Sequence, residues 1–183
     1  MATERERLEL PFKEDGLGGL RIAIVGSRGW RFPDWISEMV RNIGPFTLVS
    51  GGAKGPDRIA EGVCRALDYP EPMIYLPDWK GKGRAAGFDR NTTIIEMSSM
   101  TVAFWDSKSN GTRDTMKKTY RAGKPLFIVE SVFTMESKAT KEVPLVRLFN
   151  AKALEELNVG CDLESWESDR RILESKGDGP EAS

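Results

Sequence analysis

The sequence contains no histidine and only two cysteines, Cys64 and Cys161. The absence of histidine excludes a Ser-His-Asp triad, histidine-based proton transfer and metal sites that use histidine. We therefore expect no metal site and no required cofactor. Cys64 falls on the apolar face of a predicted helix, where a thiol usually serves as a small buried hydrophobic group. We expect reduced thiols and no disulfide.

The sequence also lacks a large net charge, at −1, and a long apolar segment. Lysine and arginine total 27 residues against 28 for aspartate and glutamate in a chain of 183. Because this balance gives no whole-chain attraction for polyanions, we expect nucleic acid to be an unlikely partner. No segment approaches the length of a membrane span, and the charged amino terminus does not resemble a signal peptide. These features predict a cytoplasmic protein without a membrane partner.

Length and composition predict one domain with tails. We expect a flexible lead at residues 1–19 and a domain at 20–150, which carries nearly all of the regular apolar pattern. Scattered apolar residues among many charges predict a helical extension at 151–175. Residues 176–183 are predicted to be a disordered tail.

Apolar strands alternate with segments of helical periodicity through the predicted domain. The predicted strands are 21–25, 46–50, 73–77, 101–105 and 125–129, with an edge strand at 143–149 because it contains Pro144. The predicted helices are 33–43, 57–67, 88–99 and 112–122. This βαβ alternation predicts an α/β fold with a Rossmann-like, doubly wound, mostly parallel sheet and helices on both faces.

A strand, a glycine-rich turn and a helix follow one another at residues 46–58. Gly51, Gly52 and Gly55 permit positive φ angles and close backbone approach, while Asp57 suits the N-cap or first turn of the helix. Backbone amides at such a helix start bind phosphate. A tight turn without a ligand fits these residues equally well. The predicted phosphate site also takes in Ser50, Ala53 and Lys54.

Small and polar residues also follow the other strands, where ligands of open α/β sheets bind. After the first strand, Arg28 can reach an anion or remain a solvated loop residue. After the fourth strand, Asp106 can accept hydrogen bonds from a ribose, and Thr112 can cap the next helix. The remaining candidates at these two strand ends are Gly26, Ser27, Ser109, Asn110 and Gly111.

A basic segment precedes the fourth predicted strand. Residues 80–90 carry four basic side chains against Asp89, so their local charge is 4 minus 1, or plus 3. We expect residues 78–87 to form a mobile basic loop that clamps phosphate or is simply solvated. Arg90 opens the next helix, with Asn91 beside it, and is the predicted principal phosphate partner. The alternative is that Arg90 only forms a surface salt bridge with Asp89 or Asp106.

Four blocks occur in one order, namely 24–28, 50–57, 87–91 and 103–112. Together they resemble the SLOG superfamily, the Rossmann-like group that holds the DNA-processing protein DprA and the Lonely-guy cytokinin-activating enzymes. The closest resemblance is to its stand-alone YspA-like branch. The resemblance covers about residues 20–130. It implies a nucleotide or nucleotide-derived ligand between the two glycine-rich turns, and a homo-oligomer.

The sequence departs from the Lonely-guy signature Pro-Gly-Gly-x-Gly-Thr-x-x-Glu, whose glutamate assists cleavage of the N-glycosidic bond. Thr115 stands at that position here. Asp114, one position earlier, is rotated by roughly 100° around the helix. We therefore favour a protein that binds a nucleotide or nucleotide-derived ligand in order to sense or sequester it.

Two alternatives remain. The first is a phosphoribohydrolase of nucleoside monophosphates in which Arg90 holds the phosphate and Asp106, Asp114 or Asp57 supplies the carboxylate. The second and weaker alternative is DprA-like binding of single-stranded DNA, supported by Trp79 among basic residues.

Overall fold

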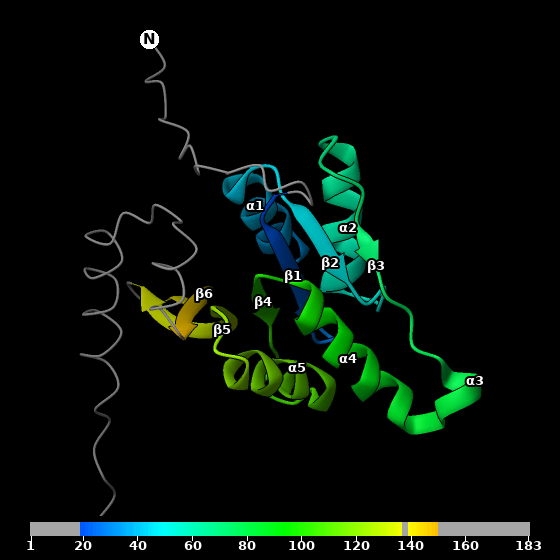
Figure 1. The fold of residues 1–183 in the computed structure, drawn as a ribbon. Coiled ribbons are helices and arrows are strands. Elements are labelled where there is room, and N and C mark those ends of the chain that lie inside the picture. Colours follow the sequence, from blue (N-terminus) through cyan, green and yellow to red (C-terminus); the bar gives the residue numbers. More distant parts are fainter. Residues whose placement is uncertain (1–18, 137–138, 150–183) are drawn as a thin grey trace, which may run out of the picture. The chain divides into compact units, whose positions relative to one another are not determined.

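The computed structural model describes residues 19–136 and 139–149 (Figure 1). In chain order the elements are β1 (Arg21–Gly26), α1 (Pro33–Ile43), β2 (Thr47–Ser50), α2 (Pro56–Ala66), β3 (Met73–Ile74), α3 (Trp79–Lys82), the 3-10 turn η1 (Gly83–Ala85), α4 (Ala86–Met97), β4 (Met100–Phe104), α5 (Asn110–Arg121), β5 (Leu126–Glu136) and β6 (Ala139–Phe149). The predicted lead, apart from residue 19, and the predicted segments 151–175 and 176–183 lie outside these ranges. None of the helices within the ranges has the length and apolar character that crossing a membrane requires.

The six described strands form one sheet in the order β3-β2-β1-β4-β5-β6. Every neighbouring pair is parallel except β5 and β6, which are antiparallel. The predicted α/β fold with a Rossmann-like, mostly parallel sheet is therefore confirmed. The chain moves outward from β1 to β3 and then returns to place β4 on the other side of β1. Ligands of open α/β sheets bind beyond the carboxyl ends of the strands at such a reversal.

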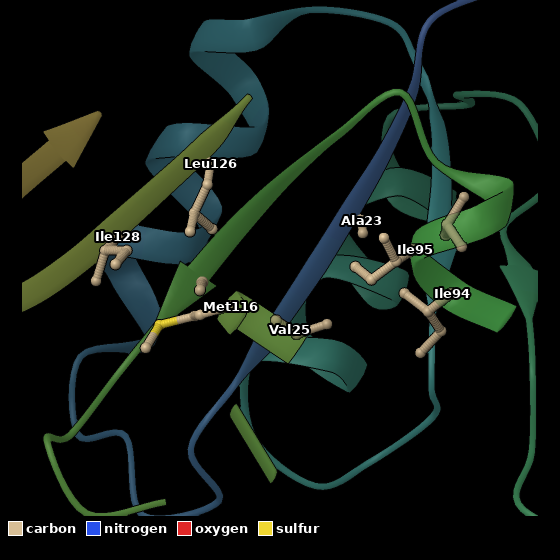
Figure 2. Packing of buried hydrophobic residues seen from close by; sticks show 9 residues of the cluster. Ala23, Val25, Ile94, Ile95, Met116, Leu126 and Ile128 are labelled. Carbon is tan, nitrogen blue, oxygen red and sulfur yellow. The ribbon is translucent and has the colours of Figure 1, made fainter. Parts of the chain in front are cut away.

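Helices cover both faces of the sheet, with α1 packed against α2 and α4 packed against α5. On one face, the strand residues Ala23 and Val25 lie in a buried cluster with Ile94 of α4 and Met116 of α5 (Figure 2). Because side chains alternate along a strand, Ile22 and Ile24 of β1 point to the other face of the sheet, where α1 and α2 pack.

The apolar spacing predicted for the first two helices is confirmed by their buried faces. Ile36 and Val40 of α1 and Ala60 and Cys64 of α2 are all fully buried. Full burial of an aliphatic side chain of the size of isoleucine stabilises the fold by about 1.5–3 kcal/mol. Burial also raises the pKa of the Cys64 thiol to about 11. This cysteine is therefore a small core residue, as predicted.

Three predicted segments differ from the structure in extent. The strand predicted at 73–77 ends at Ile74, because its partner β2 ends at Ser50, whose carbonyl accepts a last hydrogen bond from the Tyr75 N–H (2.9 Å). The strands predicted at 125–129 and 143–149 extend into a hairpin of eleven residues each. The prediction that Pro144 marks an edge strand is confirmed.

The prediction of a loop at 78–87 was wrong, because most of this segment is helical. Its residues form α3, η1 and the first two positions of α4. The reason is a local cap, because the Asp78 carboxylate accepts a hydrogen bond from the Gly81 N–H (2.9 Å) and closes the turn. A short polar residue ahead of a turn often initiates helical structure in this way.

Candidate functional site

A cavity of about 420 Å³ lies where β1 and β4 end, at the reversal of the strand order. The predicted site residues that line it are Gly26, Arg28, Ala53, Asp57, Arg90, Asn91, Asp106, Ser109, Gly111 and Thr112. The other predicted ligand residues lie outside the lining, namely Ser27, Ser50, Gly51, Gly52, Lys54, Gly55 and Asn110. Both glycine-rich segments therefore line the cavity, the first with Ala53 and Asp57 and the second with Ser109, Gly111 and Thr112.

Five lining residues were not among the predicted ligand residues, namely Val25, Gly29, Ile94, Lys108 and Thr115. Two of them carried a usable signal. Ile94 and Thr115 each lie three or four positions after a predicted site residue on the same helix, and such positions share a helix face. Lys108 stands between two predicted residues of the second turn.

The first glycine-rich turn is occupied by a carboxylate of the chain itself. The N–H groups of Gly51 (3.1 Å) and Ala53 donate to the Asp57 carboxylate. The Gly52 N–H donates to the Ser50 hydroxyl (3.1 Å). Asp57 lies in the first turn of α2, as predicted, but Gly55 is the N-cap residue. Three of the amides that we expected to hold phosphate, those of Gly51, Gly52 and Ala53, are thus already bonded within the chain.

Arg90 faces this buried carboxylate. Burial raises the pKa of Asp57 to about 6, while the positive charge of Arg90 opposes this rise. The Arg90 Nη1 donates to the Gly51 carbonyl (2.6 Å), and its Nε is buried with no hydrogen-bond partner among the described residues. A Cβ atom at Gly51 would lie 1.5 Å from Arg90 Nη1. Any side chain at position 51 would therefore collide with the Arg90 guanidinium, so this position requires glycine.

The alternative expected for Arg90 was a surface salt bridge to Asp89 or Asp106. The structure gives both carboxylates other partners. Asp89 pairs instead with Lys82 (2.8 Å). Asp106 accepts its hydrogen bonds from Ser27 and from backbone amides. Arg90 is consequently a partly buried residue held by the first turn, and its guanidinium borders the cavity.

Asp106 ties the end of β1 to the second turn. Its Oδ1 accepts hydrogen bonds from the Ser27 hydroxyl (2.7 Å) and from the N–H groups of Lys108 (3.0 Å) and Ser109 (2.8 Å). Burial raises the pKa of Asp106, but these hydrogen bonds outweigh burial and leave the pKa below its usual value. The carboxylate is therefore ionised at neutral pH.

The second turn opens α5 with its backbone toward the cavity. Ser109 is the N-cap, and its Oγ accepts hydrogen bonds from the N–H (3.3 Å) and hydroxyl (3.0 Å) of Thr112. The prediction that Thr112 caps this helix was wrong, because the capping oxygen is supplied three positions earlier. Asn110 and Gly111 lie in the first turn, where N–H groups have no partner within the helix. A Cβ atom at Gly111 would have no described atom within 4 Å, so this backbone is open.

The charged groups on the lining favour an anion. Arg28, Arg90 and Lys108 contribute three positive charges, against the carboxylates of Asp57 and Asp106. Both carboxylates accept hydrogen bonds from backbone amides, which satisfies part of their charge within the chain. In the described ranges, no group of three or more acidic or cysteine side chains is arranged to hold a metal ion.

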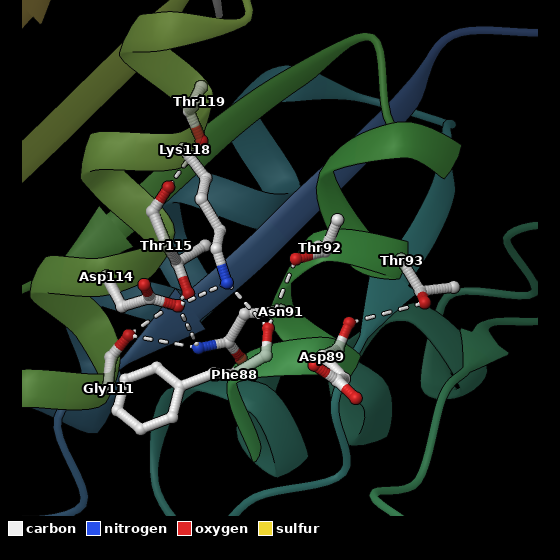
Figure 3. A network of polar contacts seen from close by, with 10 residues as sticks. All are labelled: Phe88, Asp89, Asn91, Thr92, Thr93, Gly111, Asp114, Thr115, Lys118 and Thr119. Atoms are coloured by element: carbon white, nitrogen blue, oxygen red, sulfur yellow. Dashed lines mark hydrogen bonds and ion pairs between the residues drawn. The ribbon is translucent and has the colours of Figure 1, made fainter. Parts of the chain in front are cut away.

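Asp114 lies outside the cavity, in a polar network between α4 and α5 (Figure 3). Its Oδ2 accepts a hydrogen bond from Asn91 Nδ2 (3.0 Å) and pairs with Lys118 Nζ (2.8 Å). Thr115, at the position of the Lonely-guy glutamate, does line the cavity, and its hydroxyl donates to the Gly111 carbonyl (3.1 Å). The carboxylates that border the cavity are thus those of Asp57 and Asp106.

Gly26 serves the packing beneath the site. A Cβ atom there would lie 2.4 Å from Cγ of Pro56 and 2.8 Å from the Phe104 carbonyl oxygen. Gly26→Ala is therefore expected to destabilise the protein by about 1–3 kcal/mol through overpacking, measured by urea unfolding. Gly29→Ala is the matched control, because its Cβ would meet only an Asp106 oxygen at 3.8 Å. Equal stability of the two variants would contradict this role of Gly26.

No protein-family model matches the chain, and no curated protein matches its sequence. Among solved structures, DNA processing protein A from Helicobacter pylori matches 86% of this chain and 81% of that chain. The TM-score is 0.52 and the sequence identity is 17%. The chain shares this protein's fold. DNA processing protein A belongs to the group that the four sequence blocks resemble.

The comparison corrects the expectation that nucleic acid is an unlikely partner. The matching structure of DNA processing protein A is described for its single-stranded DNA binding mode. The expectation was wrong because it relied on the net charge of the whole chain. Binding of a polyanion depends on the local arrangement of charge and aromatic groups, which net charge does not report.

Proposed function

We propose that the cavity binds the phosphate group of a nucleotide and that the protein senses or sequesters this ligand. The observation that carries the proposal is the open backbone of Gly111 at the start of α5, beside Arg28, Arg90 and Lys108. A helix N-terminus attracts anions through its free N–H groups and its dipole. We also propose membership of the SLOG superfamily and, within it, of the YspA-like branch, on the sequence blocks and the shared fold.

The geometry favours the second turn over the first as the phosphate position. At the first turn, Asp57 already presents a carboxylate to the amides of Gly51 and Ala53. An incoming phosphate would have to displace this buried group. At the second turn, Ser109 caps the helix while the Cα of Gly111 stays uncovered. Phosphate can approach the backbone there without moving any described side chain.

Binding without turnover is the form we propose, because α5 directs Thr115 rather than a glutamate at the cavity. The phosphoribohydrolase alternative retains one specific observation, namely that Asp57 borders the cavity and has its pKa raised to about 6. A carboxyl group with such a pKa suits acid–base chemistry. Release of free base from nucleoside monophosphates would identify turnover.

A second candidate function is binding of single-stranded DNA, favoured by an exposed apolar and basic surface. Leu76, Trp79 and Phe88 are 73%, 55% and 50% exposed. Lys80 and Arg84 are exposed between the two aromatic residues in the sequence. Aromatic rings that stack bases beside cations that neutralise phosphates are the usual elements of a single-strand surface.

One thermal-shift experiment compares a nucleotide, the matching nucleoside and a single-stranded oligonucleotide. A nucleoside 5′-monophosphate is expected to raise Tm, while the matching nucleoside raises it much less, because the phosphate supplies the main contact. Ligand at 100 times its Kd adds about 2.7 kcal/mol to the stability of the native state. Equal shifts from nucleotide and nucleoside would contradict a phosphate site. An oligothymidylate that shifts Tm strongly at low salt and weakly at high salt, without a mononucleotide effect, would favour the second candidate.

A further inference from the structure

We infer that a second cavity, next to the phosphate cavity, binds a nucleobase. The inference rests on the proposed function. This cavity has a volume of about 320 Å³, and its lining includes the aromatic residues Trp30, Phe32 and Trp105. It shares Gly29, Asp106 and Lys108 with the phosphate cavity. The two cavities are therefore adjacent parts of one binding region.

The aromatic wall is fixed before any ligand arrives. The Trp30 indole N–H donates to the Phe32 carbonyl (3.0 Å), and its ring meets the buried Phe104 edge to face at 5.4 Å between centroids. Phe32 stacks on Trp35 at 4.2 Å with an interplanar angle of 11°. The Arg31 guanidinium also lies over the Phe32 ring, 5.5 Å from its centroid, so Phe32 supports the wall and the surface left for a base is that of the two tryptophans. Rings held in place lose little conformational freedom on binding. Base stacking on aromatic side chains is favourable for every nucleobase.

Trp105 links this wall to the phosphate position. Its indole N–H donates to the carbonyl of Ser109, the N-cap of α5 (3.3 Å), and the Arg113 guanidinium lies 5.5 Å from the ring centroid. Trp105, which lines the second cavity, therefore donates a hydrogen bond directly to the turn proposed to hold phosphate. A ligand that occupies both cavities would pass Asp106, which is the residue predicted from the sequence to contact a ribose.

A carboxylate at the same cavity supplies hydrogen-bond acceptors for the edge of a base. Glu130 Oε1 accepts from the Ser107 hydroxyl (3.2 Å), and Oε2 pairs with Arg147 Nε (3.2 Å). Each carboxylate oxygen has two acceptor positions, so both retain capacity for a further donor. Carboxylates accept hydrogen bonds from exocyclic amino groups of bases. The cavity therefore suits an amino-bearing base such as adenine, offered by a mononucleotide or by one residue of a single strand.

The test compares AMP with ribose 5-phosphate by isothermal titration calorimetry, because the two differ at C1, where AMP carries adenine and ribose 5-phosphate a hydroxyl group. Wild type is expected to bind AMP about ten-fold more tightly, the low end of the effect of stacking one base. Ser131 lines only the second cavity, so Ser131→Leu is expected to reduce this ratio to near one while leaving ribose 5-phosphate binding unchanged. Ser131→Ala is the control, because it removes the hydroxyl without filling space and should keep the ratio.

A second readout needs no variant. The indole N–H resonance of Trp30 in wild-type protein is expected to shift with AMP and to stay in place with ribose 5-phosphate. The Trp105 resonance, whose N–H donates to the Ser109 carbonyl, is expected to shift more with AMP than with ribose 5-phosphate. Equal affinity of the two ligands, or the absence of these shifts while both ligands bind, overturns the base site and leaves the phosphate site intact. Failure of both ligands to bind at millimolar concentration overturns the proposed function and the base site with it.

Discussion

Arg90→Ala is expected to destabilise the protein by about 2 kcal/mol at pH 8 and by less at pH 5. The positive charge of Arg90 acts on the buried carboxylate of Asp57 and opposes the burial that raises the pKa of this group to about 6. Removing this charge leaves the buried carboxylate without its largest compensating interaction, and the partial exposure of Arg90 reduces the cost through solvent screening. The variant also loses the hydrogen bond to the Gly51 carbonyl.

The direction of the pH dependence follows from the Asp57 carboxyl group. Its folded-state pKa is raised above its ordinary value of 3.8, so its contribution to stability is present at low pH and is lost as pH rises through about 6. Removing Arg90 raises this pKa further and extends the loss to higher pH. The gap between wild type and variant should therefore widen from pH 5 to pH 8.

Urea unfolding at several pH values measures this effect. Arg84→Ala is the matched control, because Arg84 is an exposed arginine a short distance before α4. It should change stability little, and equally at each pH. Adding Asp57→Asn to Arg90→Ala should remove the pH-dependent part of the loss. A loss for Arg90→Ala that is the same at pH 5 and pH 8 would show that Arg90 does not act through Asp57.

Gly111→Val is expected to weaken nucleoside monophosphate binding by a hundred-fold or more while leaving the fold intact. Hydrogen bonds to charged groups contribute about 1.5–3 kcal/mol each, and a side chain over this backbone would obstruct them. The Cβ at this position meets no described atom within 4 Å. Replacing an exposed helical glycine also removes an unfavourable helix propensity, so stability should be unchanged or higher.

Gly62→Val is the control for this variant. Gly62 is an exposed glycine within α2, a Cβ there also meets no described atom within 4 Å, and it lies outside both cavity linings. The two substitutions make the same chemical change in the same kind of element. Calorimetric titration should show wild-type affinity for Gly62→Val alone. Wild-type affinity in a folded Gly111→Val protein would remove the second turn from the phosphate site.

Much of the fold could be predicted because its signals are local. The apolar run at 21–25 predicts a buried strand. The spacing of Ile36 and Val40 in α1, and the position of Cys64 in α2, predict which face of each helix is buried. Pro144 reports an edge position because it cannot donate a ladder hydrogen bond. The placement of the cavity at the strand ends followed from the βαβ alternation itself.

The use of each site residue could not be predicted, because it depends on contacts between distant segments. Asp57 and Ser109 are both short polar residues near a helix start, yet Ser109 caps α5 while Asp57 turns back to the preceding amides. Gly51 and Gly111 are alike in sequence, but Arg90, 39 positions after Gly51, covers one and leaves the other open. The aromatic cavity went unnoticed because Trp30 and Trp105 come from separate strand ends.

The most direct test of the phosphate position is an amide NMR titration of the wild-type protein with a nucleoside 5′-monophosphate. The account predicts large chemical-shift changes at the N–H groups of Asn110 and Gly111, which have no partner within α5. It predicts small changes at Gly51 and Gly52, whose N–H groups donate to Asp57 and Ser50. Large changes at Gly51 and Gly52 without changes at Asn110 and Gly111 would contradict it.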